Sequence, residues 1–172
     1  MDEGRRRSVR NFVLVAATLV LVALFGPRMC GSSLLASGTA APPFSVTRLA
    51  DGDPVTLGDL RGRPAVLFFW AAWCKACKEM LPGLTALAAE RRTTRFVALH
   101  GDGEVSMDDQ AAKARAFPAL EFAAGGERFL GAYRVTTFPT TYVLDADGRI
   151  CGGVVGRASA DVVARLLDRC GS

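Results

Sequence analysis

The sequence predicts an α/β fold, in which the buried strands of a central sheet are followed by helices that cover it. Ala65–Trp70 is apolar without period-2 alternation, as expected of a strand buried on both faces of a sheet. From Cys74 onward the period becomes helical, with residues of one face at Cys77, Leu81, Leu84 and Ala88. A second apolar run, Arg95–His100, predicts a further core strand.

The other elements follow from turn residues and strand-forming runs. Phe44–Leu49 and Pro54–Leu57, joined by Ala50–Asp53, predict an N-terminal hairpin, and Leu60–Pro64 leads into the central strand. The remaining expected elements are a helix at Asp108–Ala116, an edge strand at Ala119–Phe122, a hairpin of Thr140–Leu144 and Arg149–Val155, and a closing helix at Ser159–Arg169.

Two cysteines three positions apart, in Trp73-Cys74-Lys75-Ala76-Cys77, lie where the central strand gives way to the helix. Unpaired N–H groups and the positive end of the helix dipole stabilise a thiolate at Cys74, and Lys75 adds a nearby cation. Cys77 lies one turn later on the same side, so it can close an intramolecular disulfide. Because the thiolate is the attacking form, the pattern predicts a nucleophile with its resolving partner.

The same two cysteines are also half of a metal site. A structural zinc ion needs four ligands, but the chain has no second Cys-x-x-Cys and a single histidine, His100. His100 ends an apolar run and is interpreted as a strand-end residue, so we predict no bound metal and no cofactor. A Cu(I) carrier is the alternative, because two thiolates suffice for that soft ion.

A second signal is Pro139, which opens the β-branched and aromatic run Thr140–Leu144. Proline is tolerated at the first residue of a strand or at a sheet edge. A cis bond before Pro139 would turn the chain sharply and leave the neighbouring backbone free to pair with another molecule. A trans proline at a strand start is the commoner case, so both alternatives stay open on these residues alone.

With both motifs in view, the chain from about Pro43 to Asp168 resembles the TlpA/ResA-like membrane-anchored thiol-disulfide oxidoreductases of the thioredoxin superfamily. The matching segments are Phe44-Ser45-Val46, Gly62-Arg63-Pro64, Phe69-Trp70-Ala71-Ala72-Trp73-Cys74, Pro139-Thr140-Thr141 and Asp145-Ala146-Asp147-Gly148-Arg149. The resemblance implies a thioredoxin-like fold, a central mixed sheet flanked by helices with an N-terminal β-hairpin. It also implies an enzyme that reduces protein disulfides outside the cytoplasm, in cytochrome c maturation or copper-protein assembly, with electrons from a membrane donor. A copper-binding or redox-silent module of the same fold is the alternative.

The resemblance also implies roles for individual residues. Cys74 corresponds to the attacking cysteine, Cys77 to the resolving cysteine, and Pro139 to the cis-proline that faces the dithiol and pairs with a substrate backbone. Phe138 is then expected to help set specificity and redox potential. The supporting residues beside the dithiol are Trp73, Lys75 and Phe138.

A carboxylate that could accept the proton of Cys77 has to be sought elsewhere in the sequence. Thioredoxin has a buried Asp two residues before its first tryptophan, and this chain has Phe68 at that position. TlpA/ResA-like proteins supply a Glu from the segment after the third strand, so Asp102 or Glu104 is the candidate here. The alternative is an ordinary solvated loop carboxylate.

The N-terminal residues predict a membrane segment. Arg5-Arg6-Arg7 and Arg10 precede the apolar run Phe12–Phe25, whose length lies between a signal-peptide core and a full span. Gly26–Cys30 offers no good cleavage site, which favours an uncleaved single-pass anchor over a signal peptide whose removal leaves a secreted periplasmic domain. The basic residues place the N-terminus in the cytoplasm and the domain on the periplasmic side. We divide the chain into a basic tail with the membrane segment (1–28), a flexible tether (29–42) and a thioredoxin-like domain (43–172).

The distribution of charge excludes one class of function. The chain carries a formal charge of +4, but residues 1–28 hold five Arg and two acids, which leaves 16 basic and 15 acidic residues elsewhere. A nucleic-acid binder concentrates basic charge on its folded domain. We therefore expect no nucleic-acid partner, and as partners a protein disulfide substrate, a membrane electron donor and the membrane itself.

A structural disulfide between Cys151 and Cys170 is also expected, with Cys30 left unpaired on the tether. From Cys151 to Gly156 the strand runs about 17 Å, and from Ala160 to Cys170 the helix returns about 15 Å. Because the two lengths match, the helix end comes back to the strand start, within the roughly 4.4 to 6.8 Å between Cα atoms that a disulfide needs. The alternative is two unrelated cysteines, with Cys30 competing for either one.

Overall fold

The computed structural model describes residues 14–16, 34–101 and 107–170, and a mixed sheet forms its centre. The strands are β1 (Ser45–Arg48), β2 (Pro54–Thr56), β3 (Ala65–Trp70), β4 (Arg95–His100), β5 (Glu121–Ala124), β6 (Thr140–Leu144) and β7 (Ile150–Val155). They form one seven-stranded sheet in the order β2-β1-β5-β4-β3-β6-β7. β4 pairs in parallel with β3 and β5, and the other neighbouring strands are antiparallel, so the expected mixed sheet is present.

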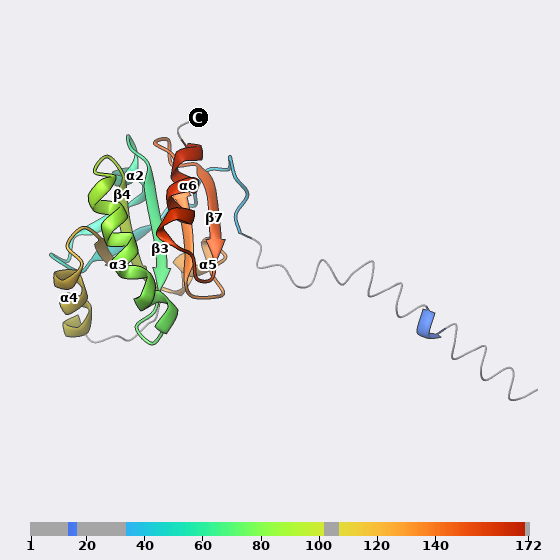
Figure 1. The fold of residues 1–172 in the computed structure, drawn as a ribbon, viewed down its shortest axis with the longest axis horizontal. Helices are drawn as coiled ribbons and strands as arrows, with labels where there is room; N and C mark the ends of the chain where they lie inside the picture. The colour runs from blue at the N-terminus through green and yellow to red at the C-terminus, as the bar shows by residue number, and fades with distance from the viewer. Residues whose placement is uncertain (1–13, 17–33, 102–106, 171–172) are drawn as a thin grey trace, which may run out of the picture. The chain divides into compact units, whose positions relative to one another are not determined.

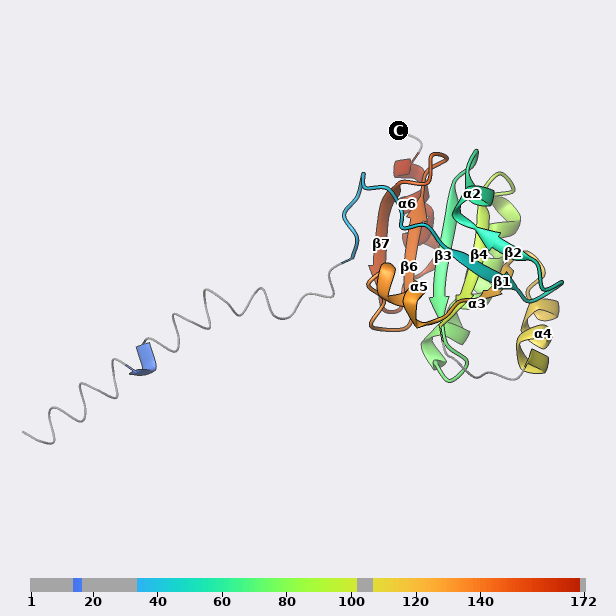
Figure 2. The ribbon, with the colours of Figure 1, turned by 180° about the vertical axis from the view of Figure 1, so that it is seen from behind.

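Helices cover both faces of the sheet. They are α2 (Leu57–Leu60), α3 (Lys75–Glu90), α4 (Met107–Ala116), α5 (Glu127–Ala132) and α6 (Ala160–Cys170). α3 and α6 lie on one face, over an apolar core that includes both cysteines of the dithiol motif (Figure 1). α2 and α5 lie on the opposite face, over a second core rich in aromatic rings (Figure 2). The sheet thus separates two apolar cores, which makes the fold α/β and thioredoxin-like.

β3 is the central strand of the sheet, and all of its residues are buried. It lies between β4 and β6, and its side chains alternate between the two cores. Phe68 and Trp70 belong to the core under α3, whereas Leu67 and Phe69 belong to the core under α5. Burial on both faces explains why this strand is a continuous apolar run.

The prediction of an edge strand at Ala119–Phe122 is wrong. The strand is β5, which lies inside the sheet between β4 and β1. The N-terminal hairpin adds β1 to the side of β5 that was expected to be open. Arg48 on β1 and Arg95 on β4 both form ion pairs with Glu121 on β5, so this carboxylate joins three neighbouring strands. The edges of the sheet are β2 and β7.

The predicted tether at residues 29–42 is folded against the domain from Leu34 onward. We call Leu34–Pro42 the N-terminal strap. The backbone N–H of Leu35 donates to the hydroxyl of Tyr142 at 3.1 Å, and the hydroxyl of Tyr133 donates to the carbonyl of Pro42 at 2.9 Å. The folded unit therefore begins at Leu34 rather than at residue 43, because two buried tyrosines hold the strap in place.

The predicted membrane segment lies outside the described residues, apart from Leu14–Ala16, and so does Cys30. Within the residues that are described, no helix is both long enough and apolar enough to cross a bilayer. The anchor therefore stays a prediction.

Cys151 on β7 and Cys170 at the end of α6 form the expected disulfide. Their Cα atoms are 5.4 Å apart and their sulfurs 1.96 Å apart. α6 packs on β6 and β7, so its end returns to the start of β7 as the matched lengths predict. The bridge ties the C-terminal helix to an edge strand.

Replacing both Cys151 and Cys170 by serine should lower the free energy of unfolding by about 3 kcal/mol. The reason is that a cross-link closing a loop of this length lowers the conformational entropy of the unfolded chain, and its loss restores that entropy. Urea denaturation of the oxidised protein measures the change. Cys30→Ser is the control and should leave the free energy of unfolding unchanged. An equally stable double variant would contradict a structural role for the bridge.

Candidate active site

Cys74 and Cys77 form a disulfide at the start of α3, with Cα atoms 5.3 Å apart and sulfurs 2.10 Å apart. Cys74 is the N-cap residue of α3, and its Sγ accepts a hydrogen bond from the backbone N–H of Cys77 at 3.1 Å. Cys74 is 5% exposed, whereas Cys77 has no exposed surface. Cys74 is therefore the member of the pair that another molecule reaches first.

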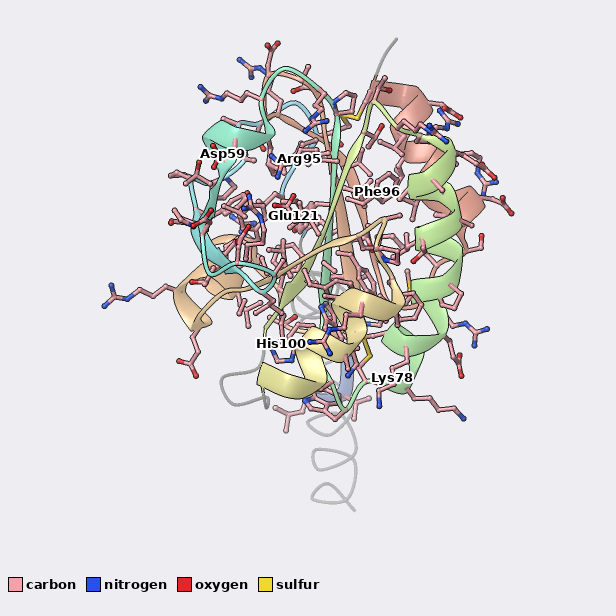
Figure 3. The ribbon with its side chains drawn as sticks, turned by 90° about the vertical axis from the view of Figure 1, so that its left-hand side faces the viewer. Asp59, Lys78, Arg95, Phe96, His100 and Glu121 are labelled. Atoms are coloured by element: carbon pink, nitrogen blue, oxygen red, sulfur yellow. A yellow bond between two sulfur atoms is a disulfide. The ribbon has the colours of Figure 1, made fainter. Side chains whose placement is uncertain are left out.

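The turn between β3 and α3 positions Cys74. β3 ends at Trp70, and the backbone N–H of Cys74 donates to the carbonyl of Ala71 at 3.1 Å, which closes the turn. The first N–H groups of α3 and the positive end of its dipole then lie at the Cys74 sulfur, where they stabilise a thiolate after reduction. Lys75 on the first turn of α3 is exposed and adds positive charge. Lys78 on the same turn is exposed as well (Figure 3).

Pro139 follows a cis peptide bond and lies immediately before β6. Thr140 is the ladder partner of Phe69, so Pro139 comes level with Trp70, where the turn to the dithiol leaves the sheet. The carbonyl of Pro139 accepts a hydrogen bond from the backbone N–H of Gly156 at 2.7 Å, which ties this loop to the end of β7. The proline and the dithiol therefore lie at the same end of the sheet.

Two aromatic side chains join the dithiol turn to the loop before β6. The ring centroids of Trp73 and Phe138 are 6.0 Å apart, edge to face, and Trp73 is 68% exposed. Phe138 also lies against Gly101, the residue after β4. A Cβ built on Gly101 would come within 2.5 Å of Phe138 Cζ and 2.9 Å of Leu130 Cδ2. Phe138 thus contacts the loops that follow β3 and β4.

The position of the thioredoxin acid holds Phe68, whose side chain is buried in the core under α3. The candidate acceptors Asp102 and Glu104 lie outside the described residues. His100, a strand-end residue in the sequence analysis, is indeed the last residue of β4 (Figure 3). It is buried, and its ring lies edge to face with Trp70 at 5.1 Å between centroids. Its burial was not predicted, because one histidine at a strand end carries no periodic signal.

The pKa shifts concern other parts of the domain. Burial raises the pKa of Tyr133 and of Tyr142, the two residues that hold the N-terminal strap. Hydrogen bonds from the hydroxyl and the backbone N–H of Thr56 lower the pKa of Asp59 in the capping box of α2. Cysteines in a disulfide do not titrate, so the dithiol acquires its own protonation chemistry only after reduction.

The dithiol is the donor set on which the copper alternative depends. Among the described residues, no group of three or more His, Cys, Asp or Glu side chains could hold a metal ion. Two thiolates are released when the disulfide is reduced, and these are the soft ligands that Cu(I) prefers. Metal binding by the reduced protein is therefore a measurable alternative to disulfide exchange.

Comparisons with known proteins place these residues in context. Residues 37–151, which include both cysteines of the dithiol motif and Pro139, match the AhpC/TSA family. The chain is 32% identical over 169 residues to the thiol-disulfide oxidoreductase ResA of Oceanobacillus iheyensis, covering 94% of this chain and 86% of that protein. It is 31% identical over 137 residues to the thioredoxin-like protein YneN of Bacillus subtilis, covering 76% of this chain and 78% of that protein. The structure of MTB dsbF in its mixed oxidized and reduced forms matches with a TM-score of 0.65 and 28% identity, over 74% of this chain and 94% of that chain.

Gly101→Ala should displace the ring of Phe138, because the added Cβ would lie 2.5 Å from its Cζ. We expect the free energy of unfolding to fall by about 1–3 kcal/mol, the usual cost of overpacking, and the near-ultraviolet circular dichroism of the aromatic pair to change. The matched control is Gly131→Ala in α5, where an added Cβ meets nothing within 4 Å. Equal stability and equal spectra for the two variants would show that Gly101 does not position Phe138.

Proposed function

Because this chain belongs to the AhpC/TSA family and is a ResA-like thiol-disulfide oxidoreductase of the thioredoxin superfamily, we propose that Cys74 and Cys77 are its redox-active pair. The observation that carries the proposal is the position of Cys74 at the N-cap of α3, bonded to a fully buried Cys77 one turn later. The helix start stabilises the Cys74 thiolate, the form that attacks a disulfide. Pro139 is proposed to face this sulfur and to pair with the substrate backbone.

In the proposed reaction, the Cys74 thiolate attacks one sulfur of a protein disulfide. The substrate S–S bond breaks, one substrate sulfur leaves as a thiolate, and the other stays bonded to Cys74 as a mixed disulfide. Cys77 then loses its proton and attacks the Cys74 sulfur, which releases the second substrate thiolate. The substrate has gained two electrons and takes up two protons, and the enzyme is left as the Cys74–Cys77 disulfide. A dithiol donor restores the enzyme by the reverse exchange.

The proposed substrates are disulfides in proteins. Trp73 is largely exposed, and with Phe138 it forms an apolar surface beside Cys74. Aromatic surface of this kind suits contact with a polypeptide, because it buries a large apolar area with few rotatable bonds. We propose that the enzyme works as a reductase in cytochrome c maturation or copper-protein assembly, with Phe138 as a determinant of which partner binds.

The proposed location is the extracytoplasmic face of a membrane. Basic residues before the apolar run Phe12–Phe25 support an N-terminus in the cytoplasm. The Cys151–Cys170 bridge supports an oxidising compartment around the domain, because structural disulfides persist there. In such a compartment a reductase needs a steady supply of electrons, and a membrane donor is the proposed source.

Cys77→Ser should accumulate mixed disulfides with native partners, because the first attack still occurs and the resolving thiol is missing. Cys74→Ser should accumulate few, because the remaining Cys77 sulfur is buried. Non-reducing electrophoresis of the two variants, expressed at equal levels in a cell that makes the protein, compares them. The Cys74→Ser/Cys77→Ser double variant is the background control.

Two outcomes would contradict this proposal. Equal trapping by both single variants would show that the cysteines have no distinct roles. Absence of trapping, together with one tightly bound equivalent of copper per reduced wild-type domain, would favour the copper-binding alternative. Metal analysis of the purified reduced protein is therefore measured alongside the trapping experiment.

The anchor proposal predicts that the full chain stays in the membrane fraction after an alkaline wash. External protease should release the domain by cutting between residues 29 and 34. A cut near Ala41 is disfavoured, because Ala41 is buried and its N–H donates to the carbonyl of Gly148 at 2.9 Å. Recovery of a soluble extracytoplasmic protein that starts at the residues before Leu34 would show that the segment is a cleaved signal peptide.

A further inference from the structure

Thr141 has a buried hydroxyl that lacks a hydrogen-bond partner within the described structure. The residue is 0% exposed, and its Oγ1 forms no hydrogen bond. The adjacent Thr140 is different, because its Oγ1 donates to the carbonyl of Thr137 at 2.8 Å. Buried polar groups are normally paired, and an exception needs a reason. The reason follows from where Thr141 lies in the oxidised protein.

Thr141 lies on the same face of the sheet as the dithiol. It is the cross-strand partner of Phe68, and directly opposed residues in a ladder point to the same face. Phe68 belongs to the core under α3 that also contains Cys74 and Cys77. Thr141 follows Pro139 by two residues, which is about 7 Å along an extended strand. The hydroxyl therefore lies beneath the start of α3, just inside the proline that stands at the dithiol end of the sheet.

The side chains around this hydroxyl offer little else to a buried sulfur. The described residues of this core that come from β3, β6, α3 and α6 are largely apolar, and include Val66, Phe68, Met80, Leu81, Leu84, Val143, Val163 and Leu167. The indole of Trp70 is a donor only, so it cannot accept a hydrogen bond from a thiol. The carboxylate that thioredoxin has at this level is replaced here by Phe68.

The charged and titratable groups nearby come from more distant positions. His100 at the end of β4 is buried, and as the ladder partner of Trp70 it faces the same core, although β3 separates its strand from β6. Lys113 of α4 lies over the ring of Trp70 at 5.5 Å. Lys75 and Lys78 on the first turn of α3 are exposed. Glu79 on the same turn is also exposed and is paired with Arg157 at 2.8 Å. Among the described residues, Thr141 is thus the buried hydroxyl on this face of the sheet, on the strand next to β3, and His100 is the buried titratable side chain.

We propose that the Thr141 hydroxyl is the hydrogen-bond partner of the Cys77 sulfur once the disulfide opens. A hydroxyl both donates and accepts, so it accepts from the Cys77 S–H and donates to the thiolate that forms during resolution. In the oxidised protein the disulfide holds the Cys77 sulfur at Cys74, and the Thr141 hydroxyl forms no hydrogen bond to it. Reduction frees the Cys77 sulfur to turn toward the hydroxyl. Thr141 is a positioning residue, and this inference rests on the redox roles proposed for Cys74 and Cys77.

The hydrogen bond from Thr141 does not change the number of protons or electrons that are transferred when the mixed disulfide is resolved. Cys77 gives up its proton as it attacks the Cys74 sulfur, the bond between Cys74 and the substrate breaks, and the departing substrate thiolate takes up one proton. The two electrons pass to the substrate, and the enzyme returns to the disulfide. Thr141 keeps its own proton throughout, and it stabilises the charge on Cys77 before the new S–S bond forms.

The test compares Thr141→Val, which keeps the shape and removes the hydroxyl, with Thr141→Ser, which keeps the hydroxyl. The equilibrium of the Cys74–Cys77 couple with glutathione is measured for both variants and the wild type. Thr141→Val should shift this equilibrium about tenfold toward the disulfide, which lowers the potential of a two-electron couple by about 30 mV. Thr141→Ser should stay close to wild type. Release of a preformed mixed disulfide should slow about tenfold in Thr141→Val alone.

Thermal unfolding of the oxidised proteins separates this role from a structural one. Thr141→Val should be at least as stable as wild type, because the hydroxyl that it removes has no partner in the oxidised state. A wild-type potential in Thr141→Val, or an equal shift in Thr141→Ser, would overturn the inference while leaving the proposed function intact. Failure of the Cys77→Ser variant to trap any partner in the trapping experiment would instead overturn the proposed function. This inference would then be overturned with it.

Discussion

Burial of β3 on both faces is the constraint from which the arrangement of the site follows. β3 is fully buried, so its position is fixed by two cores and by a ladder on each side. β4 runs parallel to it and β6 antiparallel, so the end of β3, the end of β4 and the start of β6 come to one end of the sheet. The dithiol turn, Gly101 and Pro139 follow from these three ends. Residues far apart in sequence therefore meet because of the strand directions alone.

The side chains that gather at this end give the site its character. Trp73 and Phe138 place aromatic surface around Cys74, while the charged groups on the first turn of α3 point to solvent. Gly101 makes this possible, since any larger residue would meet the ring of Phe138. Aromatic surface beside a cysteine that is 5% exposed suits a protein partner, because contact removes apolar surface from water without stripping charges of their hydration.

The sequence was sufficient for most elements but not for the lateral order of the strands. β3 and β4 agree with prediction, because their apolar runs are long and bounded by turn residues. The short helices α2 and α5 were not predicted, since one turn or two leaves no helical period to detect. The internal position of β5 depends on its pairing with β1 of the distant N-terminal hairpin. This pairing cannot be predicted from the local sequence of either strand. In the candidate site, Cys74, Cys77 and Pro139 were predicted from motifs, whereas the positions of Gly101 beside Phe138 and of Thr141 opposite Phe68 follow only from the fold.

The order of the proposed reaction follows from the same architecture. Cys74 is at a helix N-cap, with N–H donors at its sulfur and some surface in contact with solvent, so its thiolate is stabilised before a substrate arrives. Cys77 is buried in an apolar core, which disfavours a free thiolate. Its attack is therefore favoured only when a mixed disulfide already lies within reach. A single helical turn thus separates the cysteine that we propose starts the exchange from the one that we propose completes it.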